Sequence, residues 1–299
     1  MSFVRTALFV AVFAAVVSST AVQHQHQHSK RATAFQADAS IDVTAIAAAA
    51  RTSLNRGRNV LAQYRATQGG SASAVKIQGD WLSLNGVSAF HFIADMDTDC
   101  DGYNCPGNPD GQPETNWGAL DARVVPWIVI PQSFLDSHGS QLLLNALSAV
   151  ICGNPAKMYY AIFGDSNGDS PEVAGEVSLM LAQTCFPNDG LSGSVGHGAL
   201  DVTYIVWGTK VPTGVGQNTI NITALKTLGD QQARALQTAL GLGGAAPTSS
   251  DQCFEDGDCS GQYCCIFEDI SNRCIAKSAC VNFTCSSAAT GSQGECALG

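Results

Sequence analysis

The stretch YYAIFGDSNGDSPEVAGEVSL spans residues 159–179 and consists of two apolar runs joined by a polar segment. The first run ends in Gly164 and Asp165, and the second opens with Gly175 and Glu176. Gly, Asn, Asp, Ser and Pro dominate the segment between them, and these residues favour turns. The pattern predicts a strand, a loop and a second strand. Two carboxylates would then face each other across a cleft at the strand ends.

The spacing of Asp165 and Glu176 favours acid–base chemistry on a sugar bond only if the segment is not helical. In one helix, the eleven residues from one position to the other would span about 16 Å. As strand, loop and strand, the two carboxyl groups can reach the roughly 6.5–9.5 Å separation of an inverting glycosidase. Glutamate has the slightly higher reference pKa, so we predict Glu176 as the general acid and Asp165 as the general base. The reverse assignment stays open.

Two acidic segments also approach the twelve-residue calcium loop pattern. The first has Asp97, Asp99 and Asp101 at ligand positions, but Asn108 stands where a glutamate is needed. The second runs from Asp165 to Glu176 and has a serine in place of the glycine. Its flanks, residues 159–163 and 177–181, look like strands, whereas a calcium loop lies between helices. We therefore predict no metal and no cofactor, with a non-catalytic calcium-binding protein as an alternative.

Length, charge and the first residues limit the class of protein. The chain has 299 residues, enough for one sizeable domain and a small accessory module. Its formal net charge of −10 disfavours nucleic acid as a partner. Residues 1–21 combine an early Arg5, an apolar run and small residues before a cleavage site, which predicts a secretory signal peptide. No later stretch reaches about 18 uninterrupted apolar residues, so we expect a secreted, extracellular protein with no membrane partner.

The rest of the chain divides by composition. Residues 22–40 predict a disordered spacer with alternating His and Gln, residues 41–240 a main domain, residues 241–250 a linker, and residues 251–299 a cysteine-rich module. Eight of the twelve cysteines lie in that module, which predicts a small disulfide-stapled unit and an oxidising destination. The remaining four could form two bridges in the main domain: Cys100, Cys105, Cys152 and Cys185.

Local patterns predict a mainly β main domain with peripheral helices. Ser40 is a candidate cap for a helix that ends before Gly69 and Gly70, and two prolines mark residues 124–131 as a short or edge strand. The predicted helices are 43–68, a short turn within 134–150, and 222–240; the predicted strands are 81–87, 89–94, 124–131, 199–207 and the two that flank the opening loop.

Five runs carry a family resemblance: DMDTDCDG at 95–102, DGQPET at 110–115, KMYYAIFGDSNG at 157–168, GEVS at 175–178 and HGALDVTYIV at 197–206. They resemble the fungal-type chitosanases of glycoside hydrolase family 75, in family order and over about residues 75–208. The resemblance implies endo-hydrolysis of a β-1,4-linked glucosamine polymer with inversion, by Asp165 and Glu176. It also implies a small six-stranded barrel, with the double-psi type as the candidate topology. Asp169 is a second candidate base.

A polycationic substrate gives the other acids a possible role. Asp97, Asp99 and Asp101 are candidates for charge-assisted hydrogen bonds to the ammonium groups of chitosan, with a structural turn tied by Cys100 and Cys105 as the rival reading. Four further candidates for substrate binding are Asn167, Asp169, His197 and Asp201. Among the tryptophans, Trp81 and Trp117 could stack on sugars, whereas Trp127 and Trp207 are expected in the core.

The predicted partner is therefore chitosan, bound by a monomer. The cysteine-rich module could add affinity for chitin or another cell-wall glycan, because its double-cysteine spacing loosely resembles small hevein-like folds. Two alternatives stay open: a glycosidase that acts on a neutral glucan, and a non-catalytic secreted protein that binds calcium or carbohydrate.

Overall fold

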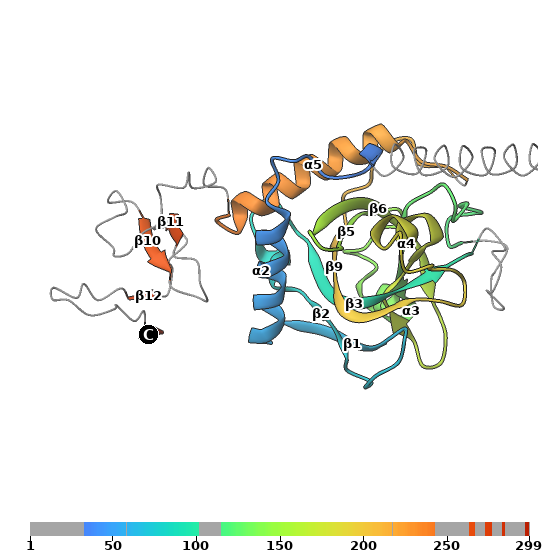
Figure 1. Cartoon of the computed structure of the whole chain (residues 1–299), viewed down its shortest axis with the longest axis horizontal. Helices are drawn as coiled ribbons and strands as arrows, with labels where there is room; N and C mark the ends of the chain where they lie inside the picture. The colour runs from blue at the N-terminus through green and yellow to red at the C-terminus, as the bar shows by residue number, and fades with distance from the viewer. Residues whose placement is uncertain are drawn as a thin grey trace, which may run out of the picture.

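The computed structural model describes residues 33–57, 59–101, 115–216 and 218–242, together with four short strands in the cysteine-rich tail (Figure 1). In chain order the elements are α2 Val43–Arg56, β1 Val60–Ala66, β2 Val75–Gln78, the 3-10 helix η1 Asp80–Ser83, β3 Phe90–Asp99, β4 Trp127–Pro131, α3 Gln132–His138, β5 Leu147–Cys152, β6 Lys157–Asn167, β7 Val173–Ala174, β8 Glu176–Ser178, α4 Leu179–Cys185, β9 His197–Trp207, α5 Ile222–Ala239, β10 Tyr263–Ile266, β11 Arg273–Ala276, β12 Phe283–Thr284 and β13 Ala297–Leu298.

Six strands close into a barrel in the order β3, β8, β4, β6, β5, β9 and back to β3. The pairs β3–β8 and β4–β6 are parallel, and the other four pairs are antiparallel. Strands β2, β1 and β7 extend the sheet outward from β3. The prediction of a mainly β, six-stranded barrel is confirmed.

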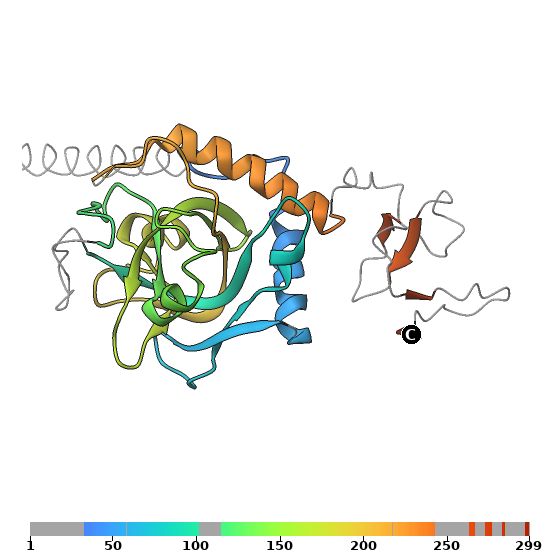
Figure 2. The same cartoon turned by 180° about the vertical axis from the view of Figure 1, so that it is seen from behind.

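Large aromatic side chains make up much of the buried core. Trp127, Trp207, Tyr160 and Tyr204 are all fully buried, and the Tyr204 ring stacks on Phe92 with centroids 4.6 Å apart. Figure 2 shows α2 and α5 along the outside of the barrel, where they cover strands that would otherwise meet water. Strands covered on both faces need continuous apolar runs rather than alternation, which explains the composition of β5 and β6.

Helix α2 is shorter than the sequence predicts. Asp42, and not Ser40, caps it: the Asp42 carboxylate accepts a 2.9 Å hydrogen bond from the Ala45 N–H. Gly57 ends the helix with a left-handed φ of 59°, and its N–H donates to the last carbonyls. The chain then continues as β1 instead of a helix to residue 68, because glycine at this position outweighs the helical spacing that follows.

Four strand assignments also differ from the sequence pattern. Residues 81–87 form η1 and a turn, with Trp81 buried against His91 at 3.8 Å between ring centroids. Strand β5 was hidden in the segment 134–150, in which only helix α3 was expected. Strand β4 is short, as predicted, but it is not an edge strand: it lies between β8 and β6, and Pro126 before it and Pro131 at its end remove no inner ladder bond. The run 177–181 leaves β8 at Leu179 and becomes α4.

Two of the four cysteines that were expected to form bridges in the main domain are paired: Cys152 at the end of β5 is bonded to Cys185 at the end of α4. Cys105, the predicted signal peptide, residues 22–32 of the predicted spacer and residues 243–250 of the linker lie outside the described residues, as do the side chains of the cysteine-rich module. Residues 33–40 of the predicted spacer are described, and Phe35 and Ala37 are buried there, with backbone hydrogen bonds to β6. None of the helices in the described part of the chain has the length and hydropathy to cross a membrane.

Candidate active site

Asp165 and Glu176 emerge on the same face of the barrel wall. Asp165 pairs with Val129 of β4, so these two side chains share a face. Val177 pairs with Ile128, the residue before Val129, and therefore lies on the opposite face. Because side chains alternate along a strand, Glu176 lies on the same face as Asp165. Strand β4 separates them, and two strand spacings of about 4.8 Å put their backbones roughly 10 Å apart. Side chains that lean toward a common space from this distance reach the range needed for inversion.

A bulge directs Asp165 to that face. The pairing of β4 with β6 shifts register at Gly164, between the pairs that hold Phe163 and Asp165. A Cβ atom on Gly164 would stand 2.7 Å from the Cβ of Trp127, so only glycine permits this close approach. Bulges near active sites commonly redirect a side chain, and the Gly-Asp pair in the sequence was the visible sign of this one.

The Asp165 carboxylate is 5% exposed and unevenly bonded. Its Oδ1 accepts hydrogen bonds from the backbone N–H groups of Ser166 at 2.8 Å and Asn116 at 3.1 Å. Its Oδ2 has no hydrogen-bond partner among the described residues. Burial, followed by the negative charge of Asp99, raises the pKa of Asp165 to about 8. One oxygen is thus held by the backbone and the other is left for a reacting group.

Glu176 stands at the start of β8, directly opposite Asp97 on β3. Its Oε2 accepts a 3.1 Å hydrogen bond from the side-chain amide of Asn167, which also donates to Asp169 at 3.1 Å. Burial, followed by the charges of Asp99 and Asp97, raises the pKa of Glu176 to about 8. Both members of the candidate pair are therefore able to retain a proton near neutral pH.

Asp99 lies close to both carboxylates. Oxygen atoms of Asp99, Asp101 and Asp165 come within 4.8 Å of one another. The Trp127 indole N–H donates to Asp99 Oδ2 at 3.1 Å, and the Asp101 N–H donates to Oδ1 at 2.8 Å. Burial and the charge of Asp101 raise the pKa of Asp99 to about 6. With one oxygen from each, these three side chains would supply three of the six to eight oxygen ligands that a calcium ion takes.

A buried framework supports the backbone before Glu176. The Tyr204 hydroxyl donates to the carbonyls of Asp95 at 2.8 Å and Gly175 at 3.0 Å. The Asp95 carboxylate accepts from the backbone N–H groups of Thr67 and Gln68 in the β1–β2 connection. Asp95, Asn116 and Tyr204 were not expected at the site, because their contacts join residues dozens of positions apart. Asp95 and Tyr204 do stand in two of the runs that carry the family resemblance, as Gly175 does, but the runs did not indicate the contacts between them.

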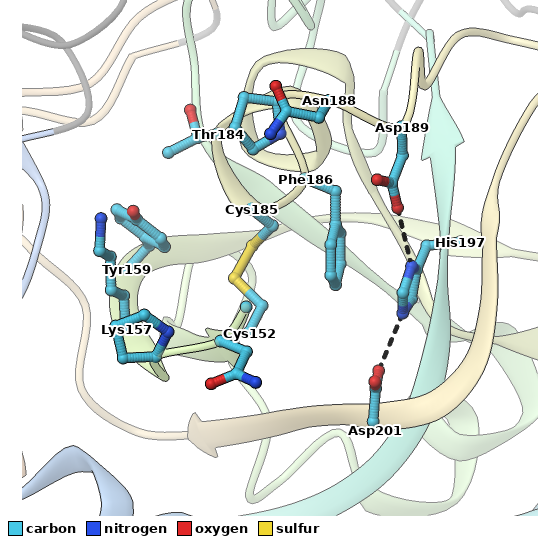
Figure 3. A pocket seen from close by; sticks show the side chains of 14 residues that line it. Cys152, Lys157, Tyr159, Thr184, Cys185, Phe186, Asn188, Asp189, His197 and Asp201 are labelled. Carbon is cyan, nitrogen blue, oxygen red and sulfur yellow. Dashed lines mark hydrogen bonds and ion pairs between the residues drawn. A yellow bond between two sulfur atoms is a disulfide. The ribbon is translucent and has the colours of Figure 1, made fainter.

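The predicted substrate residues divide into two groups. Asp97, Asp99, Asp101, Asn167 and Asp169 all lie around the candidate pair. His197 and Asp201 instead line a pocket of about 570 Å³ between the β5–β6 turn, the end of α4 and the start of β9 (Figure 3). The lining of that pocket includes neither Asp165 nor Glu176.

In this pocket the His197 ring faces a carboxylate on each side. Its Nδ1 is 3.1 Å from Asp189 Oδ2, and its Nε2 is 3.0 Å from Asp201 Oδ1 (Figure 3). The ring also stacks on Phe186 with centroids 3.7 Å apart. His197 therefore contacts two carboxylates, but neither belongs to the catalytic candidates.

Among the tryptophans, Trp81, Trp127 and Trp207 are buried and offer no face to a sugar. Trp117 is partly exposed and follows Asn116, whose N–H binds Asp165. It is the remaining tryptophan that could stack on a substrate.

The family model described as fungal chitosanase of glycosyl hydrolase group 75 matches residues 96–237. A protein named Endo-chitosanase C from Aspergillus oryzae is 46% identical over 275 residues, which cover 85% of this chain and 70% of that protein. Another Endo-chitosanase C from Aspergillus oryzae is 51% identical over 219 residues, with 70% of this chain and 55% of the other covered. An Endo-chitosanase from Aspergillus fumigatus is 35% identical over 144 residues, 42% of this chain and 58% of that protein.

Proposed function

The chain belongs to the fungal chitosanases of glycosyl hydrolase group 75, and on that premise we propose that it is a secreted endo-chitosanase. It cleaves the β-1,4 bonds between glucosamine units of chitosan, and it does so with inversion at the anomeric carbon. The observation that carries the proposal is the pair Asp165 and Glu176 on one face of the barrel, both with a pKa raised to about 8. Family membership also supports the double-psi type for the barrel.

Glu176 is the proposed acid and Asp165 the proposed base. Two backbone N–H groups hold Asp165 Oδ1 and favour its ionised form, whereas a single side-chain amide holds Glu176. The Glu176 carboxyl group gives its proton to the departing glycosidic oxygen. Asp165 takes a proton from water on the opposite face of the sugar, and the resulting hydroxide oxygen bonds to the anomeric carbon. The free Oδ2 of Asp165 suits the approach of that water.

Substrate binding follows from the charge around the pair. Asp97, Asp99 and Asp101 form an acidic wall on which the ammonium groups of chitosan bind by charge-assisted hydrogen bonds. Asn167 and Asp169 stand where a sugar hydroxyl could reach them beside Glu176. The pocket of His197 and Asp201 is a further place for polymer contacts, away from the reacting bond.

The test compares wild-type chain with Asp165→Asn and Glu176→Gln on soluble chitosan and on a neutral β-1,4 glucan, by release of reducing ends. The wild type should act on chitosan, and each variant should lose about 10²–10⁴-fold in kcat/KM, as expected when an acid or base is removed. Asp38→Asn, an exposed acid beside α5, is the matched control and should keep full activity. Proton NMR of the first product anomer reports inversion.

Three results contradict the proposal or a part of it. Wild-type protein that releases no reducing ends from chitosan would exclude the activity. Full activity in both folded variants, verified by circular dichroism, would exclude the assigned pair. Preference for the neutral glucan would leave a glycosidase but change its substrate.

A further inference from the structure

We propose that Asp99 is a positioning residue shared by Asp165 and Glu176, and that it keeps one proton in the group so that one carboxyl can act as acid while the other acts as base. This inference rests on the proposed function, since it assigns a role within the same reaction. It goes beyond the binding of ammonium groups, because Asp99 would act through the two carboxylates and not only on the sugar.

The position of Asp99 in the barrel wall supports this role. In the parallel pair β3–β8, Asp97 pairs with Glu176 and Asp99 with Ser178. Paired residues and residues two apart share a face, so Asp97, Asp99 and Glu176 emerge together. On its other side, Asp99 has a carboxylate oxygen within 4.8 Å of Asp165. Asp99 therefore adjoins both members of the pair, which lie on strands separated by β4.

The Asp99 side chain is also fixed in place. Trp127, fully buried on β4, donates its indole N–H to one oxygen, and the Asp101 N–H holds the other. Asp99 in turn satisfies the buried indole, so its carboxylate serves the fold and the site at once. A carboxylate with both oxygens bonded in this way has a defined distance to its neighbours, which a mobile surface acid would not have.

The surroundings supply negative charge and little compensation. Within the described residues, Asp99, Asp165 and Glu176 form no ion pair with Lys, Arg or His. The titratable groups that face this region are Asp97 of β3, Asp101 after β3, Asp165 of β6, Asp169 of the following loop, Glu176 of β8 and Tyr204 of β9. Since several carboxylates cannot all ionise in one partly buried space, a proton is the natural compensation.

The neighbouring carboxylates raise the pKa values of Asp165 and Glu176 to different extents, and this difference makes the proposal testable. After burial, the charge of Asp99 is the largest cause of the raised pKa of both Asp165 and Glu176. Asp97 adds to the effect at Glu176, and Asp101 adds to the effect at Asp165. Three isosteric substitutions therefore address the pair together or one member at a time.

The experiment measures kcat/KM for chitosan against pH in the full chain with Asp99→Asn, Asp97→Asn or Asp101→Asn. Removal of a neighbouring negative charge lowers the pKa of an acid, so the affected limb moves to lower pH, by about one unit for a close charge. Asp99→Asn should move both limbs. Asp97→Asn should move only the limb of the pH profile that reports the pKa of Glu176, which is the alkaline limb if Glu176 is the acid. Asp101→Asn should move only the limb of Asp165.

A KM increase with unchanged limbs in Asp99→Asn would overturn the proposal and leave Asp99 as a substrate ligand alone. If Asp99→Asn is too slow to assay, carboxyl ¹³C NMR of Glu176→Gln with and without Asp99→Asn gives the titration of Asp165 directly. A midpoint that stays in place in the folded double variant would equally overturn it. The proposed function is tested separately, since wild-type hydrolysis of chitosan does not depend on how Asp99 behaves.

Discussion

At the residue scale, the two carboxylates depend on different kinds of donor. Asp165 is held by backbone N–H groups, which no single substitution removes while the chain path is kept. Glu176 is held by the side chain of Asn167, at the end of β6. A substitution at Asn167 therefore removes the hydrogen bond to Glu176, together with the bonds that this side chain makes to Asp169 and Val173 in the following loop.

Asn167→Ala should shift the alkaline limb of kcat/KM to higher pH. The amide stabilises ionised Glu176, so its loss raises the Glu176 pKa, and the acid stays protonated to higher pH. The rate at the optimum should fall about 3–10-fold, the worth of one ordinary hydrogen bond. Asn188→Ala, in the pocket of Figure 3, is the control and should leave the limb in place. A shift to lower pH would contradict the assignment of that limb to Glu176.

Gly175→Ala should destabilise the protein more than Gly86→Ala does. Both glycines have positive φ, 127° and 78°, so both substitutions strain the backbone. At Gly86 a Cβ would meet nothing within 4 Å, but at Gly175 it would stand 2.5 Å from Asp95 Oδ1 and 3.0 Å from the Asp95 carbonyl oxygen. We expect an excess cost of about 1–3 kcal/mol for the steric overlap. Urea unfolding of both variants gives the difference in the free energy of unfolding. Equal losses would contradict a rigid placement of Asp95 beside Gly175.

At the element scale, local signals in the sequence predicted some elements and missed others for identifiable reasons. The strand, loop and strand around Asp165 and Glu176 were predictable because turn residues separate two apolar runs. Strand β5 was missed because a six-residue apolar run reads equally as a buried helix segment or a strand. The end of α2 was missed because Gly57 stops the helix while helical spacing continues.

The candidate site was predictable only in part, for the same physical reason. Asp165, Glu176 and the acids near them stand in short motifs, so the residues could be named. That Asp99 approaches Asp165 depends on the strand order of the barrel, in which β8 and β4 lie between β3 and β6, and no local pattern encodes this order. The placement of His197 beside Asp189 and Asp201, in a separate pocket, likewise depends on where α4 ends.

Gly229→Ala in α5 should destabilise the protein although alanine is the better helix former. A solvent-exposed Gly-to-Ala change would gain up to about 1 kcal/mol in a helix. Gly229 is buried, however, and a Cβ there would overlap the ring of Tyr160 on β6. Overpacking of this kind costs about 1–3 kcal/mol, so the clash should decide the sign. Gln231→Ala, exposed on the same helix, is the control for urea unfolding. A more stable Gly229→Ala would show that α5 can move off the barrel freely.

At the scale of the whole molecule, the raised carboxyl pKa values link stability to pH. Folding raises the pKa of Asp99 to about 6 and those of Asp165 and Glu176 to about 8, against about 4 for unfolded carboxyls. The folded protein thus binds more protons than the unfolded chain over this window. The free energy of unfolding should therefore fall as pH rises from about 4 to about 8.

Urea unfolding at pH steps between 4.5 and 8 measures this slope, and Glu176→Gln should make it shallower because one of the three groups no longer titrates. Stability that increases over the same interval would contradict the raised values. The carboxyls with lowered pKa, such as Asp80 beside His91, act in the other direction but at more acidic pH.

Closure of the barrel has a consequence for how the protein loses activity. Each of the six strands pairs with at least two neighbours, so none is an edge strand from which the ladder can fray. Amide protons of β3 and β6 beside the carboxylates should then exchange with deuterium only through opening of the entire domain. The site should therefore lose its geometry only when the whole domain unfolds. On heating, the fraction of activity that remains should equal the fraction of molecules that are still folded, without a partly active intermediate.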